Sequence, residues 1–289
     1  MPPFKAAVDA GVATFMTAFS DVNGVPASGN RFLMRTVLRD EWKFPGFVVS
    51  DWESIIDMIV HGFAANEMEA AFEALSAGVD MEMASTTYRD HLAELLAAKR
   101  IDQDTLDTAV RNVLRVKFQL GLFERTVTDP SRYPAVASAA NLALARKLTT
   151  QSLVLLQNRN NVLPLARASL RSLAVIGPMA DDDYEQLGTW IYDGDPALSR
   201  TPLQAIREMV GPSVTIRHVR AMETTRSRTT TVFADAVAAA SSADAAVLFL
   251  GEESILSGEA HSRANIDLPG NQMDLVRAVK SAGKPVIVV

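Results

Sequence analysis

The chain has 289 residues, of which 48% are hydrophobic and 21% charged, and its formal net charge at pH 7 is −6. This composition excludes disordered and fibrous classes, and the length suffices for one large domain or two ordinary ones. The acidic balance provides no electrostatic footprint for nucleic acid or for an anionic membrane, so neither is expected as a partner. The expected ligand is a small neutral or polar molecule.

Cysteine and histidine usage limits the metal and nucleophile chemistry that the chain can carry. Because the sequence has no cysteine, disulfide scaffolds, thiolate zinc sites and a cysteine nucleophile are excluded. Four histidines, His61, His91, His218 and His261, are not spaced as a ligand pair on one helix or strand. We therefore expect no metal and no cofactor. No stretch reaches the roughly 20 apolar residues of a membrane span, and the first residues lack the pattern of a signal peptide.

The first 123 residues alternate short apolar strands with amphipathic helices, which predicts parallel βαβ units. Strands are expected at 12–19, 47–50 and 79–83, and helices at 31–42, 53–60, 66–76, 88–99 and 104–119, the last capped by Asp102 or Asp104. The predicted strand ends near Ser20, Asp51 and Asp80 are 31 and 29 residues apart. This spacing is close to the ~31 residues of one unit in a (β/α)8 barrel. A small open parallel sheet is the alternative.

A polar, proline-bearing stretch from 124 to about 136 predicts a linker, and a helical pattern follows at 137–158. A second α/β set then places strands at 173–177, 214–219, 245–250 and 285–289, with helices at 232–241 and 271–280. The predicted division is residues 1–123, 124–170 and 171–289. Three strand–helix units are too few to close a barrel, and the chain stops inside a strand. We therefore expect part of a barrel followed by part of an α/β/α sandwich.

Asp51 is the strongest candidate for chemistry in the first half. It directly follows the apolar strand 47–50, and working groups of parallel α/β folds project from the carboxyl ends of strands. The alternative is that Asp51 caps a helix opening at Glu53. Asp80 and Glu82 are expected at the end of the next strand, where one of them could pair with Asp51 or simply steady the loops.

Glu259 is the candidate in the second half. It lies in a Gly/Ser-rich segment, 251–263, that follows a predicted strand and also contains His261 and Arg263. Most acids on such loops are only solvated. The neighbouring His261 and Arg263, and the patterned Leu-Pro-Gly-Asn-Gln at 268–272 that begins a helix, distinguish Glu259 from an ordinary surface acid.

Several motifs in this order resemble glycoside hydrolase family 3, and they extend over nearly the whole chain. They lie at 23–26, 38–52, 77–81, 121–123, 152–158, 163–165, 175–178 and 259–272. The resemblance implies the C-terminal part of a (β/α)8 barrel followed by a partial α/β/α sandwich. It also implies an exo-acting, retaining β-glucosidase that removes terminal β-D-glucosyl residues.

The resemblance further implies roles for individual residues. Asp51, in Val-Ser-Asp-Trp, would be the nucleophile, and Glu259, in Gly-Glu-Ala-His-Ser-Arg, the acid/base. Trp52, Ser20, Met83 and Arg263 would contact the substrate, a small β-glucoside or oligosaccharide. This two-carboxylate chemistry fits a retaining glycosidase, whose carboxyl groups are about 5–5.5 Å apart.

Alternatives and departures accompany this interpretation. A β-xylosidase, or an inactive remnant that only binds sugar, is also consistent with the sequence, whereas Glu259 and residues 171–289 argue against an N-acetylglucosaminidase. Phe19-Ser20 stands where many relatives carry Tyr-Asn, and the family's Lys-His motif belongs to strands that would precede Met1. We therefore expect weak hydrolysis by these 289 residues alone, and association through exposed edges, with a homo-oligomer left open. The resemblance implies a periplasmic or secreted protein.

Overall fold

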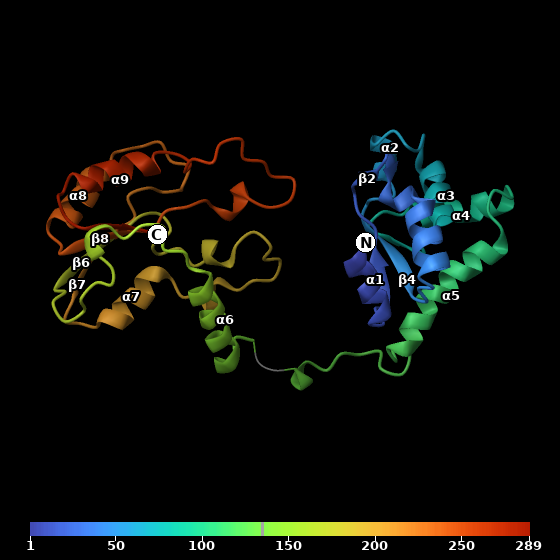
Figure 1. Ribbon diagram of the computed structural model, residues 1–289, viewed down its shortest axis with the longest axis horizontal. Helices are drawn as coiled ribbons and strands as arrows, with labels where there is room; N and C mark the ends of the chain where they lie inside the picture. Colours follow the sequence, from blue (N-terminus) through green and yellow to red (C-terminus); the bar gives the residue numbers. More distant parts are fainter. Residues whose placement is uncertain (134–135) are drawn as a thin grey trace. The chain divides into compact units, whose positions relative to one another are not determined.

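The structure is a computed structural model that describes residues 1–133 and 136–289 and divides into two compact units, Met1–Tyr133 and Pro134–Val289 (Figure 1). Each unit is built on a parallel sheet, so the predicted α/β class is confirmed. Residues 134–135, within the predicted linker, lie outside the described residues.

The first unit contains a sheet in the order β1-β4-β5, with all neighbours parallel. Its strands are β1 (Thr14–Met16), β4 (Phe47–Trp52) and β5 (Met81–Met83), and a small hairpin pairs β2 (Asp21–Val22) with β3 (Val25–Pro26). The helices are α1 (Pro2–Asp9), η1 (Ala27–Gly29), the π-helix η2 (Phe32–Glu41), α2 (Asp57–Val60), α3 (Glu67–Ala77), α4 (Thr87–Ala97), α5 (Gln103–Gln119) and η3 (Pro130–Arg132).

Local signals explain where several helices begin and end. The Asn66 side chain accepts the amide of Glu69 at the start of α3, and the helix ends at Gly78 in the left-handed conformation. Asp102 accepts the amide of Thr105, so the predicted cap of α5 is confirmed. The predicted helix at 53–60 is shorter than expected because Glu53 has a positive φ of 55°, and regular helix begins only at Asp57.

The core of the first unit lies between β4 and the helices. Val48 and Ser50 alternate along β4 on its fully buried face, while Phe47, Val49 and Asp51 lie on the less buried face. Buried residues from η2, α2 and α3 complete this cluster: Leu38, Met58, Ala70 and Ala74. Gly46 lets the backbone entering β4 approach β1, since a Cβ there would lie 1.9 Å from the Ala13 carbonyl oxygen.

The second unit has a four-stranded parallel sheet in the order β7-β6-β8-β9. The strands are β6 (Ser172–Ile176), β7 (Thr215–Val219), β8 (Ala245–Leu248) and β9 (Val286–Val288), and the helices are α6 (Ala139–Ser152), η4 (Arg159–Asn161), η5 (Glu185–Leu187), η6 (Pro196–Leu198), α7 (Pro202–Val210), α8 (Phe233–Ser241), η7 (Ser254–Leu256) and α9 (Gln272–Lys280). The predicted strands and helices of this half are found, with ends one to two residues shorter in most cases.

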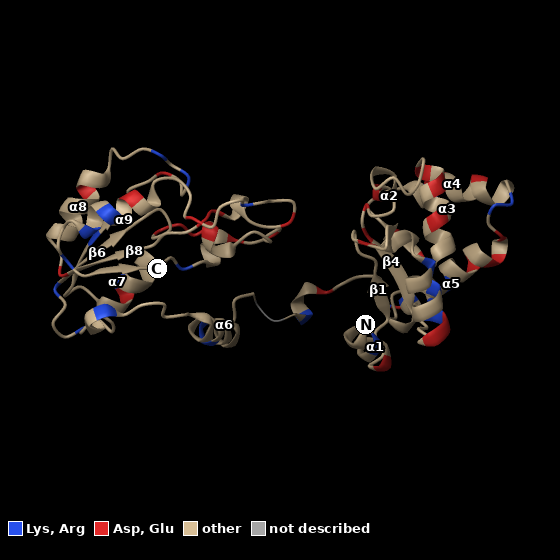
Figure 2. Cartoon of the chain, turned by 45° about the horizontal axis from the view of Figure 1, so that its top comes forward, with Lys and Arg blue, Asp and Glu red and all other residues tan. Residues whose placement is uncertain are grey.

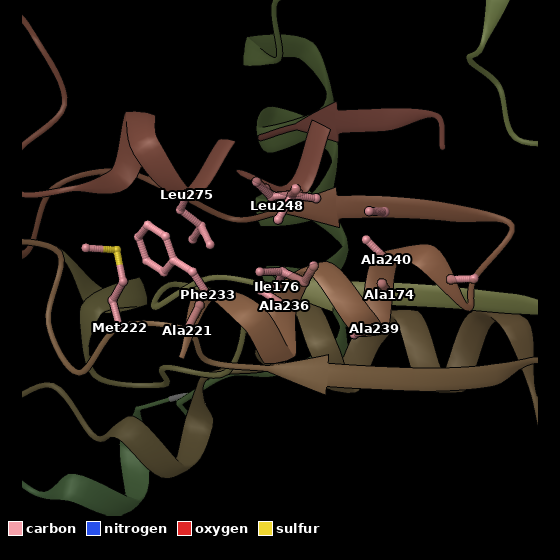
Figure 3. Packing of buried hydrophobic residues seen from close by; sticks show 13 residues of the cluster. Ala174, Ile176, Ala221, Met222, Phe233, Ala236, Ala239, Ala240, Leu248 and Leu275 are labelled. Atoms are coloured by element: carbon pink, nitrogen blue, oxygen red, sulfur yellow. The ribbon is translucent and has the colours of Figure 1, made fainter. Parts of the chain in front are cut away.

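Helices cover both faces of this sheet. Ala174, Ile176 and Leu248 pack against Phe233, Ala236 and Leu275 of α8 and α9 (Figure 3). The alternate residues Leu173 and Val175 face Leu203 of α7. Burying each large apolar side chain stabilises the fold by roughly 1.5–3 kcal/mol. The three layers match the predicted α/β/α sandwich.

Two parts of this unit differ from the predictions. The helix expected at 137–158 ends at Ser152, because Thr149, Thr150 and Ser152 hydroxyls bond back to carbonyls of the last turns and Leu153 is extended. Helix α7 was not predicted, although Thr201 and Gln204 form a complete capping box in front of it.

Candidate active site

Asp51 lies at the carboxyl end of β4, where it is half-buried on the less covered face of the strand. Its Oδ1 accepts the amide of Trp52 at 2.7 Å, and its own amide donates to Thr17 Oγ1 at 3.3 Å. Helix α2 begins six residues later and its N-terminus receives no side-chain cap. The alternative that Asp51 caps this helix is therefore wrong, and its second carboxylate oxygen carries no hydrogen bond among the described residues.

Three buried hydroxyl groups lie directly behind Asp51. Thr17, Ser28 and Ser54 are 2%, 0% and 4% exposed, and they come from the end of β1, from η1 and from the turn after β4. The Oγ atoms of Ser28 and Thr17 and those of Ser28 and Ser54 are both 2.8 Å apart, and those of Thr17 and Ser54 are 3.3 Å apart. Because each hydroxyl donates once and accepts up to twice, the ring satisfies itself and leaves Thr17 free to accept the Asp51 amide. Sequence reasoning missed this hydroxyl cluster.

The ends of β4 and β5 are fixed to each other near Asp51. The Ser50 hydroxyl accepts the Met83 amide at 2.8 Å and donates to the Asp51 carbonyl at 2.9 Å. A register shift between Val49 and Trp52 brings Trp52 opposite Met83. Trp52 is 63% exposed. The structure thus places two predicted substrate contacts, Trp52 and Met83, beside Asp51. Ser20 is exposed in the turn before β2, where its carbonyl accepts the Ala27 amide.

Asp80 does not lie at the end of a strand, which corrects the expectation that it could pair with Asp51. It precedes β5 and binds the start of β4, where its Oδ2 accepts the Val48 amide at 2.8 Å and Arg39 at 2.6 Å. Asn112 of α5 donates to its Oδ1 at 3.0 Å. Burial raises the pKa of Asp80 more than these hydrogen bonds and the Arg39 charge lower it. Asp80 is therefore a buried structural group at the opposite end of the sheet.

Glu82 also has a structural role. Its carboxylate accepts hydrogen bonds from the Thr87 hydroxyl at 2.6 Å and from the amides of Thr87 and Tyr88 at 3.0 and 2.8 Å. It thereby caps the first turn of α4 from outside the helix. The alternative reading of Asp80 and Glu82, loop and element stabilisation, is the correct one for both residues.

In the second unit, the strand order places two loops next to each other at the carboxyl end of the sheet. Chain order reverses between β6 and β8, and ligands of open α/β sheets bind outside the carboxyl ends of strands at such a switch point. The loop after β6 and the loop after β8 both leave this edge, and Figure 2 shows acidic residues gathered in the loops there. They contact each other through Thr189, whose hydroxyl lies 2.7 Å from Ser257 Oγ and donates to the Ser254 carbonyl at 3.2 Å.

Glu259 lies at the exposed tip of the loop after β8, residues 251–263, which we call the acid loop. It has no hydrogen bond or ion pair to any described residue, and the residue next to it, Gly258, has a φ of 110°. A Cβ at Gly258 would lie 2.4 Å from the Thr189 methyl group, so this position requires glycine. His261 Nδ1 lies 2.9 Å from the Ser257 carbonyl oxygen and braces the turn.

The base of the acid loop is held by charged groups. Arg263 Nε lies 2.9 Å from Glu252 Oε1, and Arg263 donates to the Asp267 carbonyl at 2.8 Å, so the predicted substrate contact has protein partners here. Glu253 accepts from Thr225 Oγ1 at 2.8 Å and from Arg226 Nε at 3.0 Å. Burial pushes the pKa of Glu253 upward, but the hydrogen bonds from Arg226 and Thr225 outweigh it and hold the pKa below its ordinary value.

Two exposed aromatic residues near the acid loop escaped the sequence analysis. Trp190 and Tyr192 follow Thr189, are 59% and 86% exposed, and have ring centroids 6.1 Å apart. Ligand sites are commonly lined by aromatic side chains with a few polar groups. The sequence did contain a signal for this site, because Trp190 and Tyr192 lie close together in an otherwise polar and acidic loop.

The described residues contain neither a metal-binding cluster nor a membrane-spanning helix. In residues 1–133 and 136–289, no group of three or more His, Asp or Glu side chains is arranged to hold a metal ion. Over the same residues, no helix combines the length and the apolar character needed to cross a membrane.

Family models match most of the chain in two parts. Residues 1–116 match the glycosyl hydrolase family 3 N terminal domain, and residues 153–289 match the glycosyl hydrolase family 3 C-terminal domain. Both matches are to the same family and occur in its N-to-C order.

Individual proteins show the same similarity. The chain is 36% identical to a periplasmic beta-glucosidase of Salmonella typhimurium, covering 100% of this chain and 41% of that protein, and 35% identical to a beta-xylosidase of Formosa agariphila, covering 100% and 42%. A crystal structure of beta-glucosidase from Listeria innocua in complex with glucose is 35% identical, with a TM-score of 0.88 over 100% of this chain and 39% of that one. The chain spans about two fifths of the length of these relatives. With both domain models matched in order and these identities extending over the whole sequence, the chain belongs to glycosyl hydrolase family 3.

Proposed function

We propose that the protein is a retaining exo-β-glucosidase that removes terminal, non-reducing β-D-glucosyl residues from small glucosides or oligosaccharides. Family membership supports glycoside hydrolysis, and the beta-glucosidases among its relatives support glucose as the sugar. The observation that carries the proposal is Asp51, a half-buried carboxylate at the carboxyl end of the central strand β4. One of its oxygens has no hydrogen bond to any described residue, and it does not cap α2.

The proposed reaction is a double displacement. Asp51 attacks the anomeric carbon while Glu259 donates a proton to the departing oxygen, and Glu259 then removes a proton from the water that releases the sugar. The proposal requires the two carboxyl groups to come within about 5–5.5 Å during turnover. It uses no metal ion and no cofactor. Trp52, Ser20, Met83 and Arg263 are proposed substrate contacts.

Each carboxylate has the setting that its role needs. A nucleophile must be held to within a fraction of an ångström, and the paired ends of β4 and β5 and the hydroxyl cluster restrain Asp51. A proton donor must be able to approach leaving groups of different shape, and the exposed tip of the acid loop suits Glu259 to that task.

The proposed architecture follows from the same comparison. We propose that residues 1–123 are the last three strand–helix units of a (β/α)8 barrel, that 124–170 connect, and that 171–289 are part of an α/β/α sandwich. The three parallel strands β1, β4 and β5, each followed by helical segments, support this assignment. The relative from Salmonella typhimurium supports a periplasmic or secreted location.

A β-xylosidase is the second candidate, because the Formosa agariphila relative is 35% identical, nearly as similar as the β-glucosidase. The two sugars differ by one hydroxymethyl group, so a modest change in the sugar pocket separates them. An inactive sugar-binding remnant is the third candidate.

The test is hydrolysis of p-nitrophenyl β-D-glucoside and β-D-xyloside by the natural protein that contains this sequence. We expect kcat/KM to be higher for the glucoside and Asp51→Ala to lower kcat by about 10³-fold or more, because the covalent step is lost. Asp40→Ala, which removes an exposed aspartate of η2, is the matched control and should leave kcat unchanged.

The remaining outcomes separate the three candidates. A preference for the xyloside would replace the β-glucosidase with the β-xylosidase. Sugar binding without turnover of either substrate would favour the inactive remnant. Turnover that survives Asp51→Ala would remove Asp51 from the mechanism.

A further inference from the structure

The side-chain amide of Gln272 joins two loops of the second unit, the one after β7 and the one between β8 and α9. Gln272 is the first residue of α9 and is fully buried. Its Oε1 accepts the Gly251 amide at 2.9 Å, and its Nε2 donates to the carbonyls of Gly251 at 2.8 Å, Thr225 at 3.0 Å and Pro269 at 3.1 Å. The two hydrogens of Nε2 thus serve three carbonyl oxygens.

Gly251 is the residue at which the acid loop leaves the sheet. Strand β8 ends at Leu248, and Gly251 opens the segment that leads to Glu259. Both the amide and the carbonyl of Gly251 are paired with the one Gln272 side chain. The Gln272 side chain thus bonds Gly251 as a residue of a neighbouring antiparallel strand would, through one N–H and one C=O. These two bonds fix the backbone direction at the start of the acid loop.

A second connection runs from Gln272 to the acid loop through Thr225. Gln272 binds the carbonyl of Thr225, and the buried hydroxyl of Thr225 donates to Glu253 at 2.8 Å. The segment around Thr225 is also held against the start of α9 by the Asn271 amide, which donates to the Ser227 carbonyl at 3.0 Å. One buried side chain therefore restrains the acid loop at residues 251 and 253.

Glu259 itself depends on these restraints. Its carboxylate contacts no hydrogen-bonding partner among the described residues, so its position is set only by the loop that carries it. The loop is held at its base by Gln272 and Thr225, across its neck by Glu252 and Arg263, and near its tip by Thr189. Of these groups, Gln272 and Thr225 are buried, so water cannot readily replace their hydrogen bonds when they are removed, and Gln272 makes more of these bonds than Thr225 does.

We propose that Gln272 is a positioning residue for Glu259, which anchors the acid loop so that the proton donor reaches the leaving group. The proposal rests on the proposed function of Glu259. Gln272 touches neither substrate nor reacting atoms, and its effect travels through Gly251 and Thr225.

The first test measures the loop without using activity. In the natural protein, Gln272→Met keeps the side-chain length but cannot form the four bonds. We expect amide hydrogen exchange in peptides covering 251–263 to become about tenfold faster or more, the factor for one lost buried hydrogen bond. Exchange in β6 should stay unchanged. Thr201→Ala, which removes the buried cap of α7, is the matched control and should leave the loop unchanged.

The second test uses the leaving group. General acid catalysis matters most when the leaving group is a poor one, such as a sugar, and least for 2,4-dinitrophenolate. We expect Gln272→Met to lower kcat/KM for cellobiose by about tenfold more than kcat/KM for 2,4-dinitrophenyl β-D-glucoside, because kcat/KM covers only the steps up to cleavage of the glycosidic bond, in which Glu259 donates its proton. A residue with a merely structural role would lower both rates equally. Thr225→Val is a milder change that breaks only the hydrogen bond to Glu253, and it should lower the two rates in the same pattern but by smaller factors. This variant replaces Gln272→Met in both tests if Gln272→Met does not fold.

The two proposals fail differently. Unchanged loop exchange in both variants overturns the anchoring role, whatever the activity. Faster exchange with equal losses for the two substrates overturns the link to Glu259. If the unmodified protein hydrolyses no glycoside, the proposed function falls, and the exchange data alone then decide whether Gln272 anchors the loop.

Discussion

Asp51 and Asp80 differ in their hydrogen bonds because they lie at opposite ends of the first sheet. Asp51 lies at the carboxyl end of β4, and one of its carboxylate oxygens has no hydrogen bond to any described residue. Asp80 precedes β5, and both of its oxygens accept hydrogen bonds, from Val48, Arg39 and Asn112. In parallel α/β barrels, residues at the carboxyl ends of the strands carry out the chemistry, whereas residues at the amino ends stabilise the fold. That Asp51 and Asp80 are both aspartates therefore says little about their roles.

From the hydroxyl cluster behind Asp51 we predict that Thr17 affects catalysis although it takes no part in the proposed reaction. Thr17→Val preserves the shape of the side chain but removes the acceptor of the Asp51 amide. We expect kcat on an aryl glucoside to fall by about tenfold, because an unsatisfied buried hydrogen-bonding group costs about 1–3 kcal/mol. Steady-state kinetics with a parallel thermal melt measure both effects.

Two further variants control this prediction. Thr17→Ser retains the hydroxyl and should restore most of kcat, and Thr36→Val, at an exposed threonine of η2, should change nothing. Equal kcat values for Thr17→Val and the unmodified protein would show that the cluster supports the fold only.

At the scale of the elements, Asp244 fastens the starts of β6 and β8. Its Oδ2 accepts the amides of Arg171 and Ser172 at 2.7 and 2.8 Å, and its own amide donates to the Ser172 hydroxyl at 3.1 Å. The hydrogen bonds from the Arg171 and Ser172 backbone hold the pKa of Asp244 below its ordinary value. This contact joins the two strands that flank the switch point.

The sign of this pKa shift gives a pH prediction. Because the folded pKa is depressed, the contribution of Asp244 to stability is complete above the unfolded pKa of about 3.9 and is lost as the pH falls through the folded value. Asp244→Asn should lower Tm at pH 7, and the difference from the unmodified protein should shrink as the pH drops below about 4. Calorimetry across this range measures it, with the exposed Asp235→Asn as control. A constant difference would contradict the assignment.

At the scale of the whole molecule, several large apolar side chains face solvent. On and after α6 these are Leu142, Leu144, Leu148, Leu153, Val154, Leu155 and Leu156. Large apolar side chains exposed within one short stretch of the chain indicate a contact surface or an association hazard.

We therefore expect this 289-residue chain to associate at micromolar concentration. Light scattering of the chain and of Leu148→Gln combined with Leu156→Gln measures the effect, because these two leucines are 57% and 91% exposed. The double variant should associate less at equal helix content. A monomer for the unmodified chain would contradict the prediction, and Met209→Gln, another exposed apolar position in α7, controls for general polarity.

Local signals in the sequence determined much of this protein. Alternation of apolar strands and amphipathic helices predicted two parallel α/β sets, and the apolar run before Asp51 indicated the end of a strand. The sequence limited the cap of α5 to Asp102 or Asp104, and the structure has Asp102. These features depend on residues a few positions apart, and periodicity and capping report on that range. The family motifs added the expected roles of Asp51 and Glu259, which remain predictions.

Tertiary structure alone decided the features that join distant parts of the chain. Asp80 meets Arg39 across 41 residues, Thr17 meets Ser54 across 37, and Gln272 meets Thr225 across 47. No local pattern distinguishes the hydroxyl cluster of Thr17, Ser28 and Ser54, or the fully hydrogen-bonded Gln272, from ordinary polar residues, because packing determines their partners. The strand order that brings the loops after β6 and β8 together follows in the same way from how the helices cover both faces of the sheet.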